Sequence, residues 1–187
     1  MSALRVRTLE RAQWLDRPPE EVFRFFERPE NLAQVTPSSL DFRLLTPSPV
    51  PMGQGRIIDY TIRVAGVRVR WRTLVSTYDP PFCFVDEQLS GPYSFWHHTH
   101  RFEPRGGGTL MTDRVRYALP AYFPAPAEAL VHRWQVGPRL RAIFDYRRER
   151  IQEIVCGDTH RPLAAAAHGC VPPDHQPQAP GIAAPER

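Results

Sequence analysis

The stretch that decides the fold is residues 82–119, which reads FCFVDEQLSGPYSFWHHTHRFEPRGGGTLMTDRVRYAL. It contains three runs in which apolar and polar residues alternate. Ser-Gly-Pro-Tyr at 90–93 and Gly-Gly-Gly at 106–108 separate these runs and are typical of turns. Because successive side chains of a strand point to opposite faces, residues two apart share a face. The stretch therefore predicts three consecutive antiparallel strands.

In each of these runs, polar side chains that can bind or transfer protons share a face with apolar ones. The shared faces are Phe84, Asp86 and Gln88 in the first run, Trp96, His98, His100 and Phe102 in the second, and Met111, Asp113, Val115 and Tyr117 in the third. Ionisable groups set among aromatic groups are typical of the wall of a binding cavity. We therefore expect the rest of the chain to close over this wall.

The residues before this stretch predict a strand, two short helices and three more strands. Residues 4–14 alternate as a strand with Leu4, Val6, Thr8 and Trp14 on one face, and the break near Leu9 indicates a bulge. Residues 16–21 predict the start of a short helix that Pro29 ends, and residues 30–35 predict a second; prolines near both starts favour a first helical turn. Residues 40–44, 56–64 and 67–78 alternate as strands.

One long helix follows the strands. Leu140, Ile143, Phe144 and Ile151 recur at helical spacing from residue 139 onward, and Gly157 is typical of a helix end. Gly137-Pro138 predicts an interruption just before this helix. Residues 157–187 are rich in Pro, Ala and Gly, so we expect a ligand-binding domain over 1–156 and a disordered tail over 157–187.

This element order predicts an α+β protein. Short connections favour a curved seven-stranded antiparallel sheet, with two short helices after its first strand. The apolar face of such a sheet is too long to stay exposed, and the long C-terminal helix is the element available to cover it. We expect the sheet to wrap around that helix.

Composition excludes several classes of protein. The chain has 187 residues and no run of 18 apolar residues, which argues against a membrane-spanning helix. Its N-terminal residues lack the apolar core of a signal peptide, so we expect a cytoplasmic location. Three scattered cysteines, at 83, 156 and 170, argue against a disulfide framework or a structural zinc site.

The positive charge comes entirely from arginine. There is no lysine, and the net charge of +4 is modest for this length. Arg68, Arg70 and Arg72 share one strand face, and their opposite neighbours include Val69 and Trp71. This alternation favours a solvated outer face of a sheet over a nucleic-acid surface. We expect no nucleic-acid partner and no stable membrane insertion.

The sequence resembles the START-like, helix-grip superfamily, also called SRPBCC, and within it the bacterial ligand-binding proteins. This superfamily includes polyketide cyclases and coenzyme Q-binding START proteins. The resemblance covers about residues 3–155. The residues that carry it are Pro19, Val22-Phe23-x-Phe25-Phe26, Pro29-x-Asn31-Leu32, Thr36-Pro37, Met52-Gly53-x-Gly55, Trp71, Asp86-Glu87-Gln88-x-x-Gly91-Pro92-Tyr93, Trp96-x-His98-x-His100-x-Phe102, Gly108-Thr109-x-Met111-x-Asp113-x-Val115-x-Tyr117-x-x-Pro120 and Ile143-Phe144-x-Tyr146-Arg147.

The resemblance implies a helix-grip fold with a hydrophobic cavity between the sheet and the long helix. It also implies a bulky apolar ligand such as a lipid, a quinone or a polyketide. The expected cavity residues are Phe84, Asp86, Gln88, Trp96, His98, His100, Phe102, Asp113, Tyr117 and Phe144.

The polar cluster of Asp86, His98, His100 and Asp113 has more than one reading. It would orient a ligand oxygen, transfer a proton, or only hold the strands together through buried hydrogen bonds. His98-x-His100 with Asp86 or Asp113 also has the composition of a two-His, one-carboxylate metal site. The resemblance implies no metal, and we expect no cofactor and name no catalytic residue.

Three functions follow from these readings. The first is carriage or sensing of a small hydrophobic ligand, which we favour over catalysis. The second is a polyketide cyclase-like enzyme that uses Asp, His and Tyr as acid and base groups. The third is an interaction module that modulates a larger complex. The ligand, the oligomeric state and any protein partner stay open at this point.

Overall fold

The computed structural model describes residues 4–120 and 125–157. Seven antiparallel strands form one sheet in the order β1-β7-β6-β5-β4-β3-β2. They are β1 (Arg7–Leu15), β2 (Arg43–Leu44), β3 (Ile57–Val64), β4 (Val67–Asp79), β5 (Cys83–Ser90), β6 (Phe95–Arg105) and β7 (Gly108–Ala118). The strands from β2 to β7 follow one another as a meander, and β1 adds to the far edge beside β7. The predicted tail at 157–187 lies outside the described residues except for Gly157.

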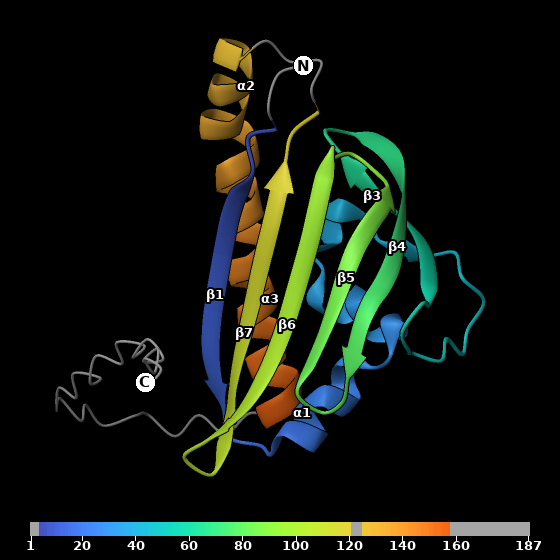
Figure 1. Ribbon diagram of the computed structural model, residues 1–187, viewed down its shortest axis with the longest axis vertical. Coiled ribbons are helices and arrows are strands. Elements are labelled where there is room, and N and C mark those ends of the chain that lie inside the picture. Colours follow the sequence, from blue (N-terminus) through green and yellow to red (C-terminus); the bar gives the residue numbers. More distant parts are fainter. Residues whose placement is uncertain (1–3, 121–124, 158–187) are drawn as a thin grey trace, which may run out of the picture.

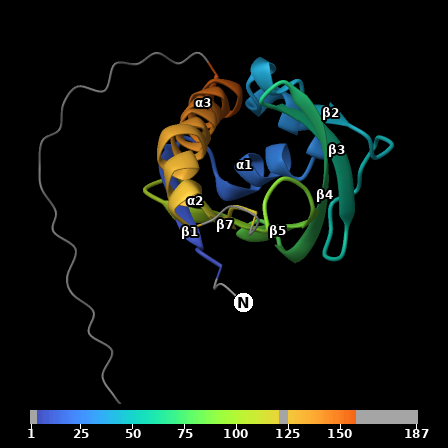
Figure 2. The ribbon, with the colours of Figure 1, turned by 90° about the horizontal axis from the view of Figure 1, so that it is seen from above.

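The helices lie on the concave side of this sheet (Figures 1 and 2). They are α1 (Pro19–Phe26), the 3₁₀ turns η1 (Pro29–Val35) and η2 (Ser38–Leu40), α2 (Ala125–Val131), the π turn η3 (His132–Val136) and α3 (Gly137–Cys156). Figure 2 shows the sheet curving from β1 round to β2, with α3 facing its concave side. The expected α+β helix-grip architecture, with a curved sheet around a long C-terminal helix, is confirmed.

Irregular pairing and a tight turn shape the sheet. The β4–β5 register shifts between Arg72 and Thr73 and again between Val75 and Thr77. Such bulges bend a strand and increase its twist, which helps the sheet curve. Gly106 and Gly107 both have positive φ, as a two-residue hairpin turn requires. This turn sets the register in which His100 lies opposite Asp113.

The helices begin and end where the sequence indicates. Pro19 stands in the first turn of α1, and Val22, Phe23 and Phe26 form its buried face. Pro138 stands in the first turn of α3, directly after the π turn at His132–Val136. The predicted interruption is therefore a π turn inside a continuous helical segment.

The predicted face of the first strand is wrong. Residues 7–15 alternate without a bulge, and Leu15 is buried whereas Trp14 is 46% exposed. Arg7 and Arg11 are on the inward face, where Arg7 pairs with Glu128 of α2 and Arg11 Nε lies 2.7 Å from Asp145 Oδ1 of α3. The inward face of this edge strand therefore combines core contacts of Leu9 and Leu15 with two arginines that find acidic partners in the distant helices.

The second strand is also shorter than predicted. Only Arg43 and Leu44 pair with β3, because Ser38–Leu40 forms a 3₁₀ turn and Asp41 has a positive φ of 41°. The Asp41 carboxylate then pairs with arginines of the outer face, including Arg68.

The remaining arginines of β4 have the expected solvated position. Arg70 and Arg72 pair with Asp59 of the neighbouring strand at 3.1 and 2.9 Å. Carboxylates therefore compensate the arginines of this outer face. In the described part of the chain, no helix is both long enough and apolar enough to cross a membrane.

Replacing Phe102 with alanine tests the core. Phe102 is fully buried and its ring lies 5.4 Å from that of Phe23 and 5.2 Å from that of Phe26. We expect Phe102→Ala to lower the free energy of unfolding by about 3–5 kcal/mol, measured by urea denaturation. Phe82→Ala is the control, because Phe82 is 47% exposed and a surface change costs at most about 0.5 kcal/mol. Similar losses in the two variants would contradict this packing.

Candidate functional site

The polar cluster is built by three neighbouring strands. Asp86 of β5 lies opposite His98 of β6, and His100 of β6 lies opposite Asp113 of β7. All four side chains therefore point to the concave face of the sheet, as the alternation predicts. Arg147 of α3 approaches the same cluster from the helix side, with its Nε 3.9 Å from Asp113 Oδ2.

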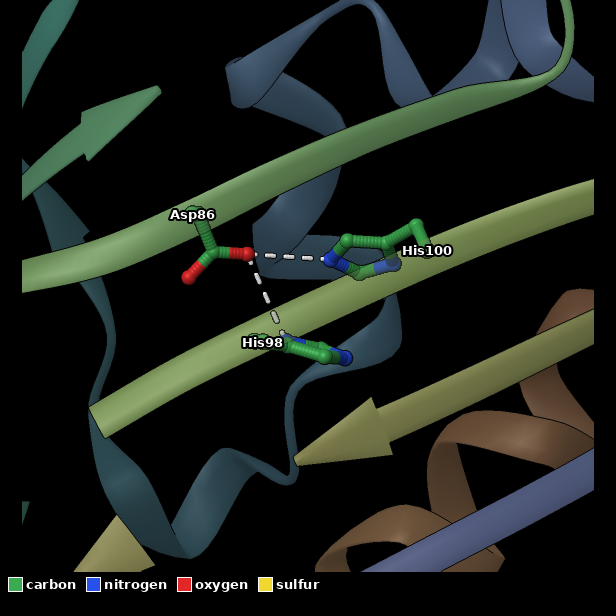
Figure 3. Close-up of side chains that lie close together, drawn as sticks. All are labelled: Asp86, His98 and His100. Carbon is green, nitrogen blue, oxygen red and sulfur yellow. Dashed lines mark hydrogen bonds and ion pairs between the residues drawn. The ribbon is translucent and has the colours of Figure 1, made fainter. Parts of the chain in front are cut away.

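Each imidazole lies between the two carboxylates. His98 Nε2 hydrogen-bonds Asp113 Oδ1 at 3.1 Å, and His100 Nε2 hydrogen-bonds Asp86 Oδ2 at 3.0 Å. The second nitrogens make cross contacts: His98 Nδ1 is 3.4 Å from Asp86 Oδ2, and His100 Nδ1 is 2.7 Å from Asp113 Oδ1. The last contact is short, but the oxygen lies out of line for an N–H hydrogen bond. Figure 3 shows both histidines converging on one oxygen of Asp86.

Burial and charge act against each other in this cluster. Burial opposes ionisation of Asp86 and Asp113, but the imidazoles and Arg147 outweigh it and lower the pKa of both carboxyls, that of Asp113 strongly. Burial also opposes a charge on His100, but Asp113 and Asp86 outweigh it and raise its pKa. Burial and the neighbouring His100 lower the pKa of His98. The cluster therefore combines two ionised carboxylates with Arg147 and two imidazoles, and the charged form is more favourable for His100 than for His98.

A cavity of about 640 Å³ lies between the sheet and α3, and the cluster forms part of its wall. The apolar walls come from β2, β3, β4, α3 and the segment around η1. They include Leu32, Val35, Leu44, Ile58, Ile62, Leu140 and Ile143. The size is within the usual range of about 300–1,000 Å³ for small-molecule sites. The cavity is therefore an apolar container with a few polar groups in its wall.

Six of the ten expected residues line this cavity. They are Phe84, Asp86, Trp96, His98, His100 and Phe144. Asp86, His98 and His100 present their polar groups beside the aromatic rings, and the Phe84 ring stacks on His100 with centroids 4.0 Å apart. The structure therefore brings the central part of the predicted wall together.

The other four expected residues do not line the cavity. Gln88 donates through its amide to the backbone oxygen of Tyr93 at 2.6 Å, so it holds the β5–β6 turn. Phe102 is enclosed by Phe23 and Phe26 in the core. Asp113 belongs to β7, one strand further from the cavity, and contacts the histidines on the side that faces away from the cavity.

Tyr117 is also directed elsewhere. Its hydroxyl is 2.9 Å from His132 Nε2 in the π turn, so it joins the sheet to the helical segment. Sharing a face with the polar residues was therefore not enough to place a side chain in the cavity. The curvature of the sheet and the position of the helices divide that face into core, cavity and rim.

Several cavity residues were absent from the prediction. Tyr60, Trp71, Thr73 and Arg147 all line the cavity. The sequence did indicate that Tyr60 and Trp71 face inward, because each is next to an arginine or aspartate that faces outward on its strand. Arg147 had no such signal, since an arginine beside an apolar helical stripe is usually solvated.

Replacing Asp113 with asparagine tests the charge balance of the cluster. We expect Asp113→Asn to lower the free energy of unfolding at pH 7 by about 3 kcal/mol, because it removes the buried carboxylate that His100 and Arg147 contact. The folded-state pKa of Asp113 is below its unfolded value, so this contribution is present above about pH 4 and is lost as pH falls further. Urea denaturation at pH 7, 4 and 3 should therefore show a shrinking difference from the unaltered protein.

Asp79→Asn is the matched control, because Asp79 is exposed at the end of β4. Its replacement should change the free energy of unfolding by less than about 0.5 kcal/mol at pH 7. An Asp113→Asn variant as stable as this control would show that the buried pairing does not contribute to folding.

Comparison with solved structures places this geometry in a known fold. A protein of Thermus thermophilus has a TM-score of 0.63 and 18% identity, over 80% of this chain and 97% of that one. The Zhui aromatase/cyclase from a Streptomyces species has a TM-score of 0.59 and 15% identity, over 80% and 96%. A point mutant of norcoclaurine synthase from Thalictrum flavum, in complex with a transition-state analogue, has a TM-score of 0.57 and 12% identity, over 82% and 99%.

A search of the curated proteins gives no match. A family model described as polyketide cyclase / dehydrase and lipid transport matches residues 7–150, which contain the whole sheet and most of α3. The expected resemblance to START-like, polyketide cyclase-like proteins is confirmed. The chain belongs to the polyketide cyclase / dehydrase and lipid transport family.

Proposed function

We propose that this protein binds a small hydrophobic ligand in the cavity between the sheet and α3, and carries or senses it. The observation that carries the proposal is the cavity itself, about 640 Å³ with walls that are mostly apolar. Burial of apolar ligand surface contributes roughly 25 cal/mol per Å², which is the main source of affinity in such a site. A lipid, a quinone or a polyketide-like molecule has the required apolar body.

The polar part of the wall supports a ligand that carries oxygen. Trp71 Nε1 and Arg147 Nε are buried at this cavity without a hydrogen-bond partner among the described residues. A buried donor without a partner is unfavourable by about 1–3 kcal/mol, and a ligand carbonyl, hydroxyl or carboxylate oxygen relieves that cost. The apolar walls therefore supply affinity, and the donors supply orientation.

Two arginines of α3, Arg139 and Arg147, line the cavity. Arg147 is 12% exposed and its guanidinium carbon lies 5.8 Å from the centre of the Phe26 ring. Arg139 precedes Arg147 by eight residues, about two helical turns, and also lines the cavity. A ligand with its oxygen toward Arg147 would place its apolar body along Phe144 and Ile143, which lie between the two arginines on α3.

A second candidate function is cyclase-like catalysis. The observation that favours it is His98, whose Nδ1 makes no hydrogen bond among the described residues and which lines the cavity as a neutral imidazole. A neutral imidazole held by a carboxylate on its other nitrogen is the arrangement of a general base. The family description includes polyketide cyclisation, and two of the similar structures are an aromatase/cyclase and norcoclaurine synthase.

Filling the cavity tests the binding proposal. Ile62 of β3 lines the cavity, and Ile62→Trp would place an indole in the space of the ligand. We expect this change to weaken binding of the apolar fluorophore 8-anilinonaphthalene-1-sulfonate at least tenfold, or about 1.4 kcal/mol, in a fluorescence titration. Competition by lipid, quinone and aromatic polyketide libraries against the same fluorophore would then identify the class of ligand.

Arg63→Trp is the control, because Arg63 is the next residue and lies exposed on the opposite face. It adds the same side chain without entering the cavity, so the fluorophore should bind as in the unaltered protein. If the two tryptophan variants bind equally well, or if the unaltered protein binds neither the fluorophore nor any library member, the binding proposal fails.

Replacing His98 with glutamine separates catalysis from binding. Glutamine retains a donor for Asp113 but cannot accept and release a proton at neutral pH. If the protein cyclises a linear poly-β-ketone to an aromatic product, we expect His98→Gln to reduce turnover about 100-fold, measured by product chromatography, with fluorophore affinity retained. Equal loss of turnover and binding, or no turnover by the unaltered protein, would exclude the cyclase candidate.

A further inference from the structure

Asp86, His98 and His100 place two imidazole nitrogens and one carboxylate oxygen close together at the wall of the cavity. His98 Nδ1 and His100 Nε2 lie 3.4 and 3.0 Å from the same carboxylate oxygen, Asp86 Oδ2. One ligand atom from each of the three residues lies within 4.8 Å of the others. Figure 3 shows the two rings, from one strand, turned toward the carboxylate of the next strand.

These separations are those of ligands around one ion. Two ligand atoms that are each about 2.1 Å from a metal, at an angle of 90–109°, lie roughly 2.9–3.4 Å apart. The two measured N···O distances are at the two ends of this range. Both nitrogens therefore lie at metal-ligand separations from the carboxylate oxygen, and the distance between the two rings, within 4.8 Å, would close around an entering ion.

Asp113 completes the arrangement from the other side. His98 Nε2 hydrogen-bonds Asp113 Oδ1, and His100 Nδ1 lies 2.7 Å from the same oxygen. Histidines that bind a metal usually donate their other N–H to a carboxylate, which fixes the ring orientation. Here Asp113 hydrogen-bonds His98 and contacts His100, so the nitrogens on the Asp86 side are the ones placed to bind an ion.

The position of the cluster leaves room for further ligands. Asp86, His98 and His100 line the cavity, whereas Asp113 does not. The remaining coordination positions therefore face the cavity, where a ligand oxygen would reach them. Two neutral imidazoles, two carboxylates, Arg147 and a divalent ion sum to +1, which favours an anionic oxygen such as an enolate, phenolate or carboxylate.

We propose that Asp86, His98 and His100 form a divalent transition-metal site of the two-His, one-carboxylate type, with Asp113 as the positioning residue that orients both rings. Imidazole and carboxylate donors suit Zn²⁺, Fe²⁺ and Co²⁺. This assignment goes beyond the expectation from the sequence, in which the His-x-His spacing alone favoured no metal. It extends the ligand-binding proposal but is tested without any organic ligand.

Titration of the full-length, chelator-treated protein with Co²⁺ tests the site, because visible absorption reports the number and type of ligands. We expect one Co²⁺ per chain, and at least 100-fold weaker binding in His98→Gln and in His100→Gln. Asp113→Asn should weaken binding about 10–100-fold, the usual effect of losing such an orienting carboxylate. Zn²⁺ in excess should raise the melting temperature of the unaltered protein and not that of His98→Gln.

His97→Gln is the matched control. His97 is the neighbour of His98 in β6 and faces the other side of the sheet, where its Nε2 is 3.8 Å from Glu87. It should bind Co²⁺ like the unaltered protein. The comparison also subtracts any binding by His160, His168 and His175, which lie outside the described residues.

Three results would overturn the proposal: no Co²⁺ spectrum with the unaltered protein, equal affinity in the His97 and His98 variants, or a Co²⁺ spectrum unchanged by replacing His98 and His100. Circular dichroism and fluorophore binding by each metal-free variant verify that it is folded. If a variant does not fold, the unaltered protein still tests the metal site. The NMR signals of the His98 and His100 side chains must then shift when diamagnetic Zn²⁺ binds. Fluorophore binding by metal-free protein with no Co²⁺ binding would reject the metal and leave the ligand-binding proposal intact.

Discussion

Two buried carboxylates of the sheet are paired with two imidazoles and a guanidinium. Asp86 and Asp113 lie in the interior of the sheet, where an unpaired charge would be highly unfavourable. His98, His100 and Arg147 make the ionised forms the stable ones. This balance lets a polar group persist in a wall that is otherwise made of aromatic and aliphatic side chains.

The same balance connects the sheet to its covering helix. Arg147 belongs to α3, and its guanidinium lies over Phe26 of α1 and near Asp113 of β7. On the same helix, Leu140, Ile143 and Phe144 face the cavity and precede Arg147 at helical spacing. Arg11 and Asp145 make a second contact between α3 and the sheet. The helix is thus held at its edges by ion pairs, while its apolar face closes the cavity.

A cavity with this wall is compatible with carriage and with catalysis, because both need an apolar ligand held in one orientation. Catalysis differs from carriage in that a side chain of the cavity wall gains or loses a proton, or binds a metal, while the ligand is bound. His98 is the residue at which the alternatives meet. It is a hydrogen-bond partner in a carrier, a proton acceptor in a cyclase, and a metal ligand in the site proposed above.

The features that depend on local periodicity could be predicted from the sequence. Alternation in residues 82–119 predicted three strands and placed Asp86, His98 and His100 on one face, and the prolines and the i, i+3, i+4 pattern predicted α1 and α3. These signals are local because a side chain's direction is set by its neighbours in the same element.

Tertiary structure decided how each shared face was used. Phe102 went to the core, Tyr117 to a hydrogen bond with His132, and Gln88 to a turn, although all three share faces with cavity residues. The two arginines on the inward face of β1 have their partners in Glu128 and Asp145, more than 100 positions away in the chain. Arg147 of α3 contacts Asp113 of β7, and only the folded structure brings these two elements together. The physical reason is that the curvature of the sheet and the docking of α3 set these contacts, and neither is encoded in the pattern of any single segment.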